Sequence, residues 1–454
     1  MPDEQEKSLL RTWDRTIYWH AFTQMADYDP LIIERAEGCR LWDIDGREYI
    51  DGVASLWCNV HGHHHPVLDA AIREQLQRVA HVTSLGASNP AAIRLAKRLV
   101  DLAPAGLGHV FFSDSGAAAV EVAIKIAFQF WRQCSDPRPR KTLYAALGDA
   151  YHGDTLGAVS VGGVDRFNAV FQPLLFEVRR LPCPDTYRTP PESASRDLTD
   201  FYLSQAEELF RREGDRIAAM IVEPLMQCAA GMIAHPPGYL RGIRELTRKY
   251  EILLIADEVA VGFGRTGTMF ACEQESVSPD LLCLGKGITG GYLPVAATLT
   301  TDAVYDAFLG DYASLRTFFH GHTYGGNPLG CAVALANLDV FEQEKTLKTL
   351  PPKVTRLRER LERIAERPHV GSVRQRGLIA GVELVRDRGT KEPYPWTECR
   401  GWKVCQIARE CGVFLRPLGD VVVIFPPPAI SLEELDRICD AVEAGIRRVT
   451  EEGE

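Results

Sequence analysis

Two short apolar runs, each followed at once by a charged or glycine-flanked position, constrain the fold of this chain most. Residues 252–256 (ILLIA) lead directly into Asp257, and residues 281–284 (LLCL) lead through Gly285 into Lys286. Short, continuous apolar runs are typical of strands buried in a parallel sheet, because helices cover both of its faces. Parallel strands end at one edge of the sheet. The sequence therefore predicts a carboxylate and an amine at the same sheet edge.

This pair of groups suits pyridoxal phosphate chemistry. An amine such as that of Lys286 can form a Schiff base with the cofactor's aldehyde. A carboxylate such as that of Asp257 can keep the pyridine nitrogen protonated, so that the ring accepts electrons from the substrate. Either residue alone would be explained as readily by a surface lysine or a helix-capping aspartate. Together they indicate a pyridoxal phosphate site.

Strand-like and helix-like segments alternate through the middle of the chain. Strands are expected at 110–112, 142–146, 218–222 and 252–256, and helices from Pro90, over 117–131 and over 238–250. Such alternation predicts an α/β fold with a mostly parallel sheet covered by helices on both faces. Before it, residues 41–50 alternate apolar and polar side chains around an Asp-Gly turn, which predicts a hairpin.

The pattern changes near residue 330, where two longer amphipathic helices enclose short strands. The second of these helices begins with a capping box formed by Ser431 and Glu434. We therefore expect three parts. Residues 1–70 form an N-terminal segment that joins the small domain, 71–330 a large cofactor-binding domain, and 331–454 a small C-terminal α+β domain.

Composition excludes several classes of function. The 454 residues carry a net charge of −10, which leaves no basic face for nucleic acid. Twelve cysteines without a C-x-x-C pair favour free thiols in a reducing compartment, and a polar N-terminus without a long apolar stretch favours a cytoplasmic location away from membranes. The histidine-rich run 61–65 lacks accompanying cysteine or carboxylate ligands, so no metal site is expected.

Further candidates stand where strands give way to turns. Ser115, Gly116 and Ala117 open a helix whose free N–H groups suit a phosphate, although plain capping would also explain them. The Tyr151 ring could lie over a pyridine ring, and the Glu223 carboxylate could set the charge of the site or bind a substrate amine. Residues 320–328 (HGHTYGGNP) form a polar glycine loop that could offer donors to a phosphate.

Residues 257–267 (DEVAVGFGRTG) and 284–291 (LGKGITGG) resemble the signature of class III pyridoxal-phosphate aminotransferases. The resemblance runs from about Trp13 to Val449. It is closest to the diaminopelargonate aminotransferases of biotin synthesis, through residues 19–25 (WHAFTQM), 114–116 (DSG), 151–155 (YHGDT) and 416–420 (RPLGD). It implies a fold type I enzyme and a homodimer with two active sites at the subunit interface.

The resemblance also implies roles for individual residues. Lys286 would hold the aldehyde and move the proton, Asp257 would pair with the pyridine nitrogen, and Tyr151 would stack on the ring. The implied cofactor site comprises Ser115, Gly116, Ala117, Tyr151, Glu223, Asp257, Lys286 and His322, with Thr323 reaching it from the other subunit. The implied substrate site comprises Phe22, Trp57, Tyr151, Asp154, Lys286, Gly321 and Arg416.

The implied reaction transfers an amino group to 8-amino-7-oxononanoate (KAPA) and gives 7,8-diaminononanoate. A long aliphatic acid requires an apolar channel with a cation at its far end, and Trp57 and Arg416 meet that requirement. Family members that use S-adenosylmethionine carry tyrosines where this chain has Phe22 and Val423, so the sequence favours lysine as the amino donor while leaving S-adenosylmethionine open. Whether Asp154 or Glu223 contacts the donor amine also stays open.

Three alternatives accompany this hypothesis. An ω-amino acid:pyruvate or ornithine-type aminotransferase of class III would share Lys286 and Asp257 but choose another acceptor. An aminomutase or decarboxylase could use the same fold, because fold and cofactor do not fix which bond breaks. A binding or scaffold protein that retains the fold is disfavoured, because each chemical position carries a competent residue.

Overall fold

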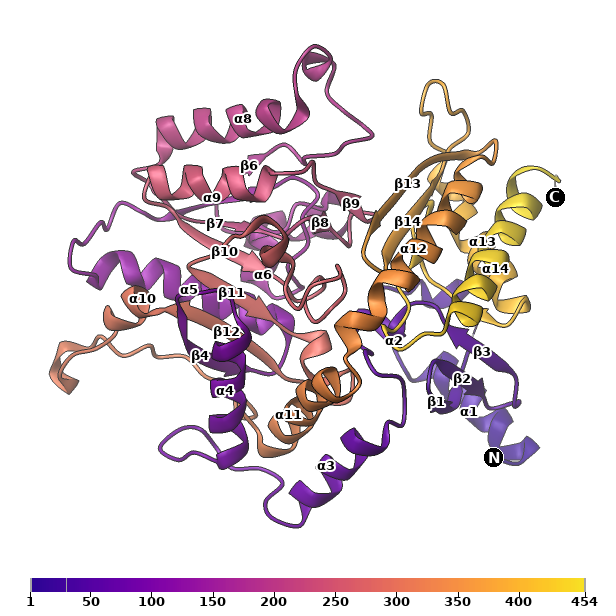
Figure 1. Ribbon diagram of the computed structural model, residues 1–454, viewed down its shortest axis with the longest axis horizontal. Coiled ribbons are helices and arrows are strands. Elements are labelled where there is room, and N and C mark those ends of the chain that lie inside the picture. Colours follow the sequence, from indigo (N-terminus) through magenta and orange to yellow (C-terminus); the bar gives the residue numbers. More distant parts are fainter. Residues whose placement is uncertain (1, 30, 453–454) are drawn as a thin grey trace.

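The structure is a computed structural model that describes residues 2–29 and 31–452. Figure 1 shows a large α/β part built on a central sheet and, beside it, a smaller part that contains the C-terminal helices and the first strands. Among the helices of residues 2–29 and 31–452, none combines the length and the hydropathy of a membrane span.

A seven-stranded sheet forms the centre of the large part. Its strands, in spatial order, are β4 (Leu107–Ser113), β12 (Ala296–Thr301), β11 (Leu281–Leu284), β10 (Leu253–Asp257), β7 (Ile217–Val222), β5 (Leu143–Leu147) and β6 (Val178–Leu181). Strand β12 runs antiparallel to both its neighbours, and the strands from β11 to β6 are parallel. Asp257 is paired with Cys283, so β10 and β11 end at one edge, as predicted.

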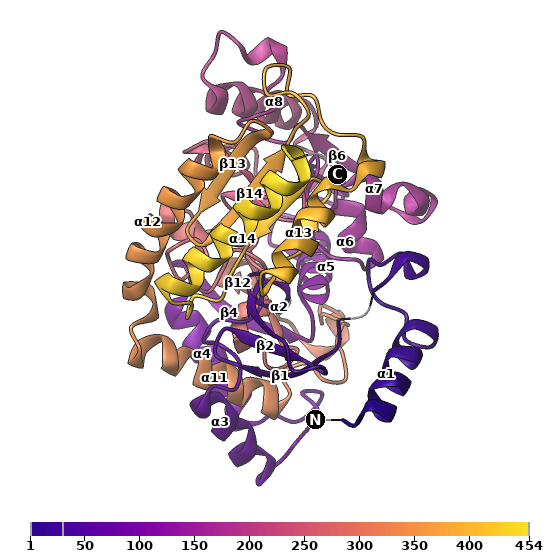
Figure 2. The same ribbon diagram turned by 90° about the vertical axis from the view of Figure 1, so that its right-hand side faces the viewer.

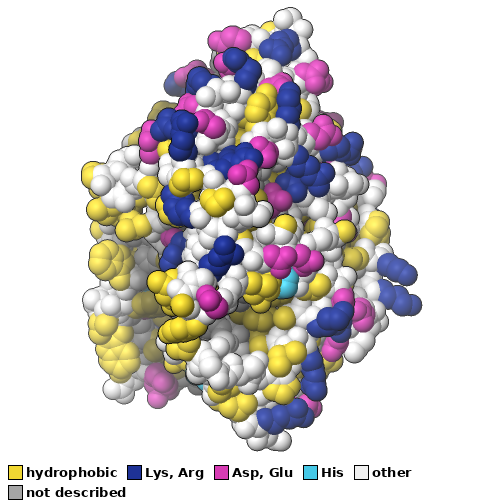
Figure 3. Space-filling view, turned by 90° about the vertical axis from the view of Figure 1, so that its left-hand side faces the viewer, with side chains coloured by type: hydrophobic (Ala, Val, Ile, Leu, Met, Phe, Trp, Pro, Cys, Tyr) yellow, Lys and Arg dark blue, Asp and Glu magenta, His cyan; other side chains and the backbone are white. Residues whose placement is uncertain are grey.

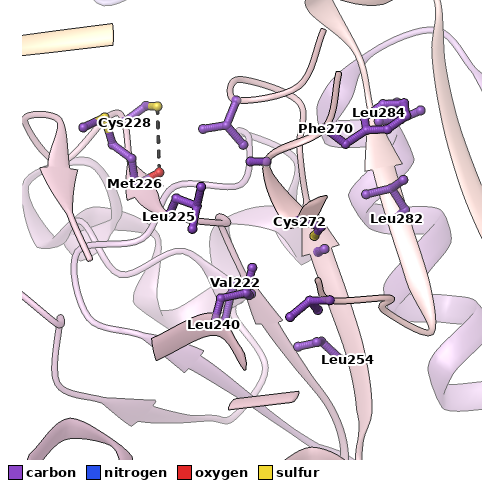
Figure 4. Packing of buried hydrophobic residues seen from close by; sticks show 14 of the residues in the cluster. Val222, Leu225, Met226, Cys228, Leu240, Leu254, Phe270, Cys272, Leu282 and Leu284 are labelled. Carbon is purple, nitrogen blue, oxygen red and sulfur yellow. Dashed lines mark hydrogen bonds between the residues drawn. The ribbon is translucent and has the colours of Figure 1, made fainter. Parts of the chain in front are cut away.

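Alternate residues of the central strands enter different cores, because successive side chains of a strand point to opposite faces. Leu254 and Leu282 belong to one buried cluster, and Ile255 and Leu281 belong to another on the opposite face. Figure 4 shows the first cluster, where Phe270 and other side chains pack beside β10 and β11. Burial of both faces explains why these strands are apolar throughout.

Helices cover this sheet and connect its strands. Those of the large part are α3 (Pro66–Leu76), α4 (Pro90–Leu102), α5 (Gly116–Gln133), α6 (Leu156–Val161), α7 (Asp165–Asn168), α8 (Leu198–Glu213), α9 (Tyr239–Lys249), α10 (Asp302–Asp306) and α11 (Pro328–Gln343). The Asn89 side chain caps α4 by accepting from Ala92 N at 2.9 Å, as expected for a helix that starts at Pro90. A short hairpin, β8 (Met226–Gln227) and β9 (Ile233–Ala234), follows β7.

The small part has its own sheet, in the order β13 (Val370–Arg376), β14 (Ile379–Leu384), β17 (Val421–Ile424) and β16 (Pro417–Leu418). Helices α12 (Thr346–Ala365), α13 (Arg400–Glu410) and α14 (Leu432–Thr450) lie over its outer face (Figure 2). The capping box predicted at the start of α14 is present, with Ser431 and Glu434 bonded reciprocally. The sheet of this part is antiparallel, so the small unit is α+β, and together with the large α/β unit it has the predicted fold type I architecture.

The N-terminal residues complete the small part. After α1 (Glu4–Thr16), strands β1 (Ile33–Glu37), β2 (Arg40–Asp43) and β3 (Glu48–Asp51) form a sheet, and β3 pairs in parallel with β15 (Val413–Phe414). The predicted hairpin is β2–β3. A strained turn, α2 (Ala54–Trp57), then leads to the large part. Helix α11 packs against α3 and α4 of the large part. We therefore propose that the boundary between the large and small domains lies at the turn between α11 and α12, after Gln343, and not at residue 330.

Candidate active site

A cavity of about 390 Å³ opens where the parallel strands end. Eight of the residues predicted for the site line it: Trp57, Gly116, Ala117, Tyr151, Asp154, Glu223, Asp257 and Lys286. A larger cavity, of about 690 Å³, lies between α12 and residues 266–267, and its lining contains none of these eight. The chemical groups therefore converge at the smaller cavity, at the sheet edge that the sequence indicated.

Asp257 ends β10 and is held from two sides. Its Oδ1 accepts from Val259 N at 3.1 Å, and its Oδ2 lies 2.7 Å from Nδ1 of His152. An ionised carboxylate can only accept, so the histidine donates in this contact. His152 is buried, and its Nε2 has no hydrogen-bond partner in the described part of the chain. The sequence did not indicate His152 as a site residue, although it stands next to Tyr151 in the 151–155 motif.

Lys286 begins the 3-10 turn that follows β11, with φ at +43°. Positive φ is uncommon for residues with a side chain and often marks a functional position. Its Nζ lies 5.0 Å from the centre of the Trp57 ring, and no described residue gives it a hydrogen bond or an ion pair. The cavity therefore presents an amine that is not engaged by a carboxylate.

Glu223 is buried at the end of β7, and each of its carboxylate oxygens accepts one backbone N–H. The donors are Tyr151 N at 3.1 Å and Cys228 N at 3.0 Å. Burial raises the pKa of Glu223 to about 7, with His152 opposing the shift and the charge of Asp257 adding to it. The two contacts fix the Glu223 carboxylate against the backbone, and both roles predicted for it, setting the charge of the site or binding a substrate amine, stay predictions.

Tyr151 and Asp154 are joined at the mouth of the cavity. The tyrosine hydroxyl donates to Oδ2 of Asp154 at 2.7 Å. Burial, and then this hydrogen bond, raise the pKa of the Tyr151 hydroxyl, so it stays neutral at ordinary pH. Asp154 is exposed, and it leaves a carboxylate available at the opening. The contact of either Asp154 or Glu223 with a donor amine remains a prediction.

The N-terminus of α5 forms another wall of the cavity. Ser115 caps the helix, because its Oγ accepts from Ala118 N at 3.2 Å. A Cβ added to Gly116 would lie 2.5 Å from Cγ1 of Val259, so a larger residue would not fit. The first N–H groups of a long helix attract an anion. Gly116 and Ala117 are therefore placed to hold a phosphate.

A row of aromatic rings leads outward from Tyr151. Its ring centre lies 6.2 Å from that of Phe167, which lies 5.5 Å from that of Phe22. The guanidinium carbon of Arg416 lies 6.0 Å from the Phe22 ring, and no described carboxylate or carbonyl pairs with this arginine. Sequence reasoning missed Phe167, because it belongs to a four-residue helix that shows no periodicity.

Gly321, His322 and Thr323 lie in an exposed loop and do not line the cavity of this chain. The loop approaches the α5 turn through one side chain, since Nδ1 of His322 lies 2.8 Å from Oδ1 of Asp114. Asp114 directly precedes Ser115. The expected contact of Thr323 with a second subunit remains a prediction.

The histidine run near the N-terminus binds carboxylates one by one. His63, His64 and His65 contact Asp51, Asp69 and Glu344, respectively. Among the residues that the structure describes, no three potential metal ligands converge.

The residues of the cavity fit pyridoxal phosphate. The amine of Lys286 suits the aldehyde, the carboxylate of Asp257 suits the ring nitrogen, and the α5 N-terminus suits the phosphate. His152 lines the same cavity, and its buried Nε2 has no hydrogen-bond partner among the described residues, which is consistent with a polar ligand nearby.

Comparison with known proteins agrees with this arrangement. Residues 23–446 match the family model described as aminotransferase class-III. The chain belongs to the class III aminotransferases. Aminotransferases of this class depend on pyridoxal phosphate, so the cofactor expected from Lys286 and Asp257 is confirmed.

Relatives of this aminotransferase match over almost their whole length. It is 52% identical over 458 residues to the adenosylmethionine-8-amino-7-oxononanoate aminotransferase of Geobacter sulfurreducens, covering 99% of this chain and 100% of that one. The crystal structure of the enzyme of the same name from Methanocaldococcus jannaschii is 42% identical, with a TM-score of 0.92 and coverage of 97% and 99%. An (S)-enantioselective ω-transaminase from Thermomicrobium roseum is 36% identical, with a TM-score of 0.92 and coverage of 98% of each chain.

Proposed function

We propose that this aminotransferase transfers an amino group to the ketone of KAPA and produces 7,8-diaminononanoate. The observation that carries the proposal is Arg416, which has no ionic partner among the described residues and lies at the outer end of the aromatic row that starts at the Lys286 cavity. A long aliphatic chain with a terminal carboxylate is complementary to such a row. The names of relatives about 52% identical refer to the same substrate.

In the proposed mechanism, each group of the cavity has one task. Pyridoxal phosphate, when bound, supplies the aldehyde that joins to amines and the ring that takes up the electrons of the breaking Cα–H bond. Lys286 Nζ accepts the proton from the donor Cα and later returns a proton to the acceptor carbon. Asp257, fixed by His152, favours a protonated ring nitrogen, and the N–H groups of Gly116 and Ala117 hold the phosphate.

We propose lysine as the amino donor, because Phe22 lacks the hydroxyl of its counterpart in S-adenosylmethionine-dependent members. Phe22 is 57% exposed and contacts the aromatic row, so a change there bears directly on a bound donor. Val423 is 1% exposed within β17 and gives weaker support. S-Adenosylmethionine is the second candidate, since the names of the relatives specify it.

We also propose that two copies of the chain form the working enzyme. Residues 307–324, which follow α10, expose Leu309, Tyr312, Leu315, Phe319 and Tyr324. Figure 3 views the molecule from the left-hand side of Figure 1, toward which this loop extends, and shows hydrophobic side chains beside a hollow. Exposed apolar patches of this kind mark interaction surfaces. A second copy seated here would bring Thr323 to its partner's cofactor phosphate.

A second candidate function is that of an ω-amino acid:pyruvate aminotransferase. It is supported by the ω-transaminase from Thermomicrobium roseum, which shares the fold at a TM-score of 0.92. No residue contact of the cavity favours an aminomutase or a decarboxylase.

Product analysis tests the proposed function. The purified enzyme with pyridoxal phosphate is incubated with lysine or S-adenosylmethionine as donor and with KAPA, pyruvate or 2-oxoglutarate as acceptor, and products are identified by mass spectrometry. Formation of 7,8-diaminononanoate from lysine and KAPA is expected. Alanine formation without any amination of KAPA would refute the acceptor, and amination only with S-adenosylmethionine would refute the donor.

A further inference from the structure

The turn that carries Trp57 has an unusual backbone. Ala54, Ser55 and Trp57 all have positive φ, at +50°, +62° and +63°. None of them is glycine, and such conformations persist only where the surrounding structure holds them. The turn places the Trp57 ring against Nζ of Lys286, at 5.0 Å from the ring centre. Some contact outside the turn must therefore keep it in place.

Asp51 holds the start of the turn, because its Oδ2 accepts from Ser55 N at 2.8 Å, and Arg265, in the loop after β10, holds Asn59 beyond Trp57. Its Nη1 donates to Pro426 O at 2.8 Å, and its Nη2 donates to Asn59 O at 2.5 Å. Asn59 follows the strained turn by two residues, and Pro426 follows β17 in the small part. One guanidinium therefore ties the large part to both segments that enclose Trp57.

The Arg265 guanidinium also lies against Phe425, the residue whose ring stacks on Trp57. Its carbon is 4.9 Å from the centre of the Phe425 ring, and that ring stacks on Trp57 at 5.4 Å with an interplanar angle of 16°. The order of contacts is Arg265, Phe425, Trp57 and Lys286. Each step is a direct contact between side chains.

General stability does not account for a charge in this place. Arg265 is 1% exposed, and no carboxylate in the described part of the chain forms an ion pair with it. Burying an unpaired charge is costly, and apolar side chains of similar volume would cost less. A planar fork that binds two carbonyls in fixed directions is the property that arginine adds and lysine lacks.

We propose that Arg265 is a positioning residue for the amino-transfer reaction, which fixes Asn59 and Phe425 so that the Trp57 ring stays against the amine of Lys286. The inference rests on the proposed role of Lys286 and does not depend on which acceptor is used. Lysine at position 265 can reach only one of the two carbonyls in the same geometry. The Trp57 ring then loses its fixed orientation, while the phosphate site at α5 is unchanged.

A double-mutant cycle tests this proposal on the holoenzyme. Arg265→Lys and Trp57→Phe are made singly and together, and the rate of the donor half-reaction is measured with the affinity for pyridoxal phosphate. A small displacement at a reacting group lowers rates steeply, so Arg265→Lys is expected to slow the half-reaction roughly tenfold with unchanged cofactor affinity. In the Trp57→Phe background it is expected to have almost no further effect.

Two further variants complete the test. Phe425→Leu removes the stacking and leaves both carbonyl contacts of Arg265, so it should slow the half-reaction and couple to Trp57 in the same way. Arg244→Lys is the matched control, because Arg244 is largely buried and binds Asp280 at 2.6 and 2.9 Å away from the cavity. It should lower thermal stability only.

Independent, multiplying effects of Arg265→Lys and Trp57→Phe would overturn the proposal. A variant Arg265→Lys that loses thermal stability but keeps the wild-type rate would also overturn it. The Lys286→Ala variant tests the proposed role of Lys286 separately from the proposed role of Arg265. If that variant still completes the half-reaction at the wild-type rate, the proposed role of Lys286 is wrong, whatever the outcome of the Arg265 cycle.

Discussion

His152 Nδ1 lies 2.7 Å from Oδ2 of Asp257, and both side chains are buried at the edge of the central sheet. The two residues are 105 positions apart in the sequence; Asp257 is the last residue of β10, and His152 lies in the loop after β5. The imidazole fixes the carboxylate that faces the cavity. The position of His152 beside Tyr151 in the sequence did not indicate this contact.

Replacing His152 should slow the donor half-reaction without preventing the binding of pyridoxal phosphate. A hydrogen bond to a charged group contributes about 1.5–3 kcal/mol, so His152→Ala is expected to slow the donor half-reaction roughly 10- to 100-fold. Stopped-flow absorbance of bound pyridoxal phosphate measures this rate. Asp257→Asn should have a larger effect. Equal rates for wild type and His152→Ala would show that the imidazole does not orient the carboxylate.

Glu223 predicts a specific pH dependence of stability. Its folded pKa, about 7, lies above the unfolded value near 4.5, so the folded protein holds this proton more tightly than the unfolded chain does. The resulting stabilisation is present in full below pH 4.5 and is lost as the pH rises through about 7. Glu223→Gln should lack this loss, which is on the order of 3 kcal/mol.

Denaturant unfolding of the cofactor-free protein at a series of pH values measures this effect. As the pH rises, the free energy of unfolding of Glu223→Gln should increase relative to that of wild type. Glu258 is a second buried glutamate of the same protein with which Glu223 can be compared. It is also buried, and burial raises the pKa of Glu258 to about 7, but it accepts from Ala271 and Cys272 away from the cavity. Parallel curves for wild type and Glu223→Gln would contradict the assignment.

Arg416 should recognise the carboxylate of the acceptor. The wild-type enzyme is expected to prefer KAPA to its methyl ester by about 10- to 100-fold in kcat/KM, because the ester removes one partner of a charge-assisted contact. In Arg416→Met, the kcat/KM values for KAPA and for its methyl ester should be nearly equal. Arg409→Met, which removes an arginine paired with Asp29 at 3.0 Å, is the control and should keep the preference. An undiminished preference in Arg416→Met would place the carboxylate elsewhere.

Phe167 should contribute to the same substrate channel. Phe167→Ala removes the ring between Tyr151 and Phe22, and a loss of about 1.5–3 kcal/mol of apolar contact corresponds to a rise in KM for KAPA of roughly 10- to 100-fold. Phe171→Ala is the matched control, since Phe171 is 46% exposed and belongs to the next turn of the chain. A rise in KM as large for Phe171→Ala would show that the effect is not specific to the aromatic row.

Local patterns predicted the parts of this molecule that depend on local physics. The apolar runs before Asp257 and Lys286 are β10 and β11, because a strand covered on both faces has no polar positions. The Asp-Gly turn is the β2–β3 hairpin, and Ser431 with Glu434 forms the capping box of α14. In each case, the residues that make the feature are close in the sequence.

The missed features depend on contacts between distant segments. Nothing near Arg265 in the sequence indicates that its guanidinium is buried between Asn59 and Pro426, because a lone arginine in a glycine-rich loop is ordinarily exposed. The place of Phe167 in the site could not be predicted from the sequence for a similar reason. Its short helix has no period, and its ring becomes part of the site only when Phe22, from the N-terminal segment, reaches it.

The central claim is that Lys286 is the amine that carries the cofactor and moves the proton. The most direct measurement is the single-turnover half-reaction with lysine, followed by absorbance, in wild type and in Lys286→Ala loaded with pyridoxal phosphate. Wild type should convert the cofactor fully to its pyridoxamine form. Lys286→Ala should bind the donor and the cofactor but convert them at least about a thousandfold more slowly, because the proton acceptor is missing. Conversion at the wild-type rate in Lys286→Ala would contradict the account.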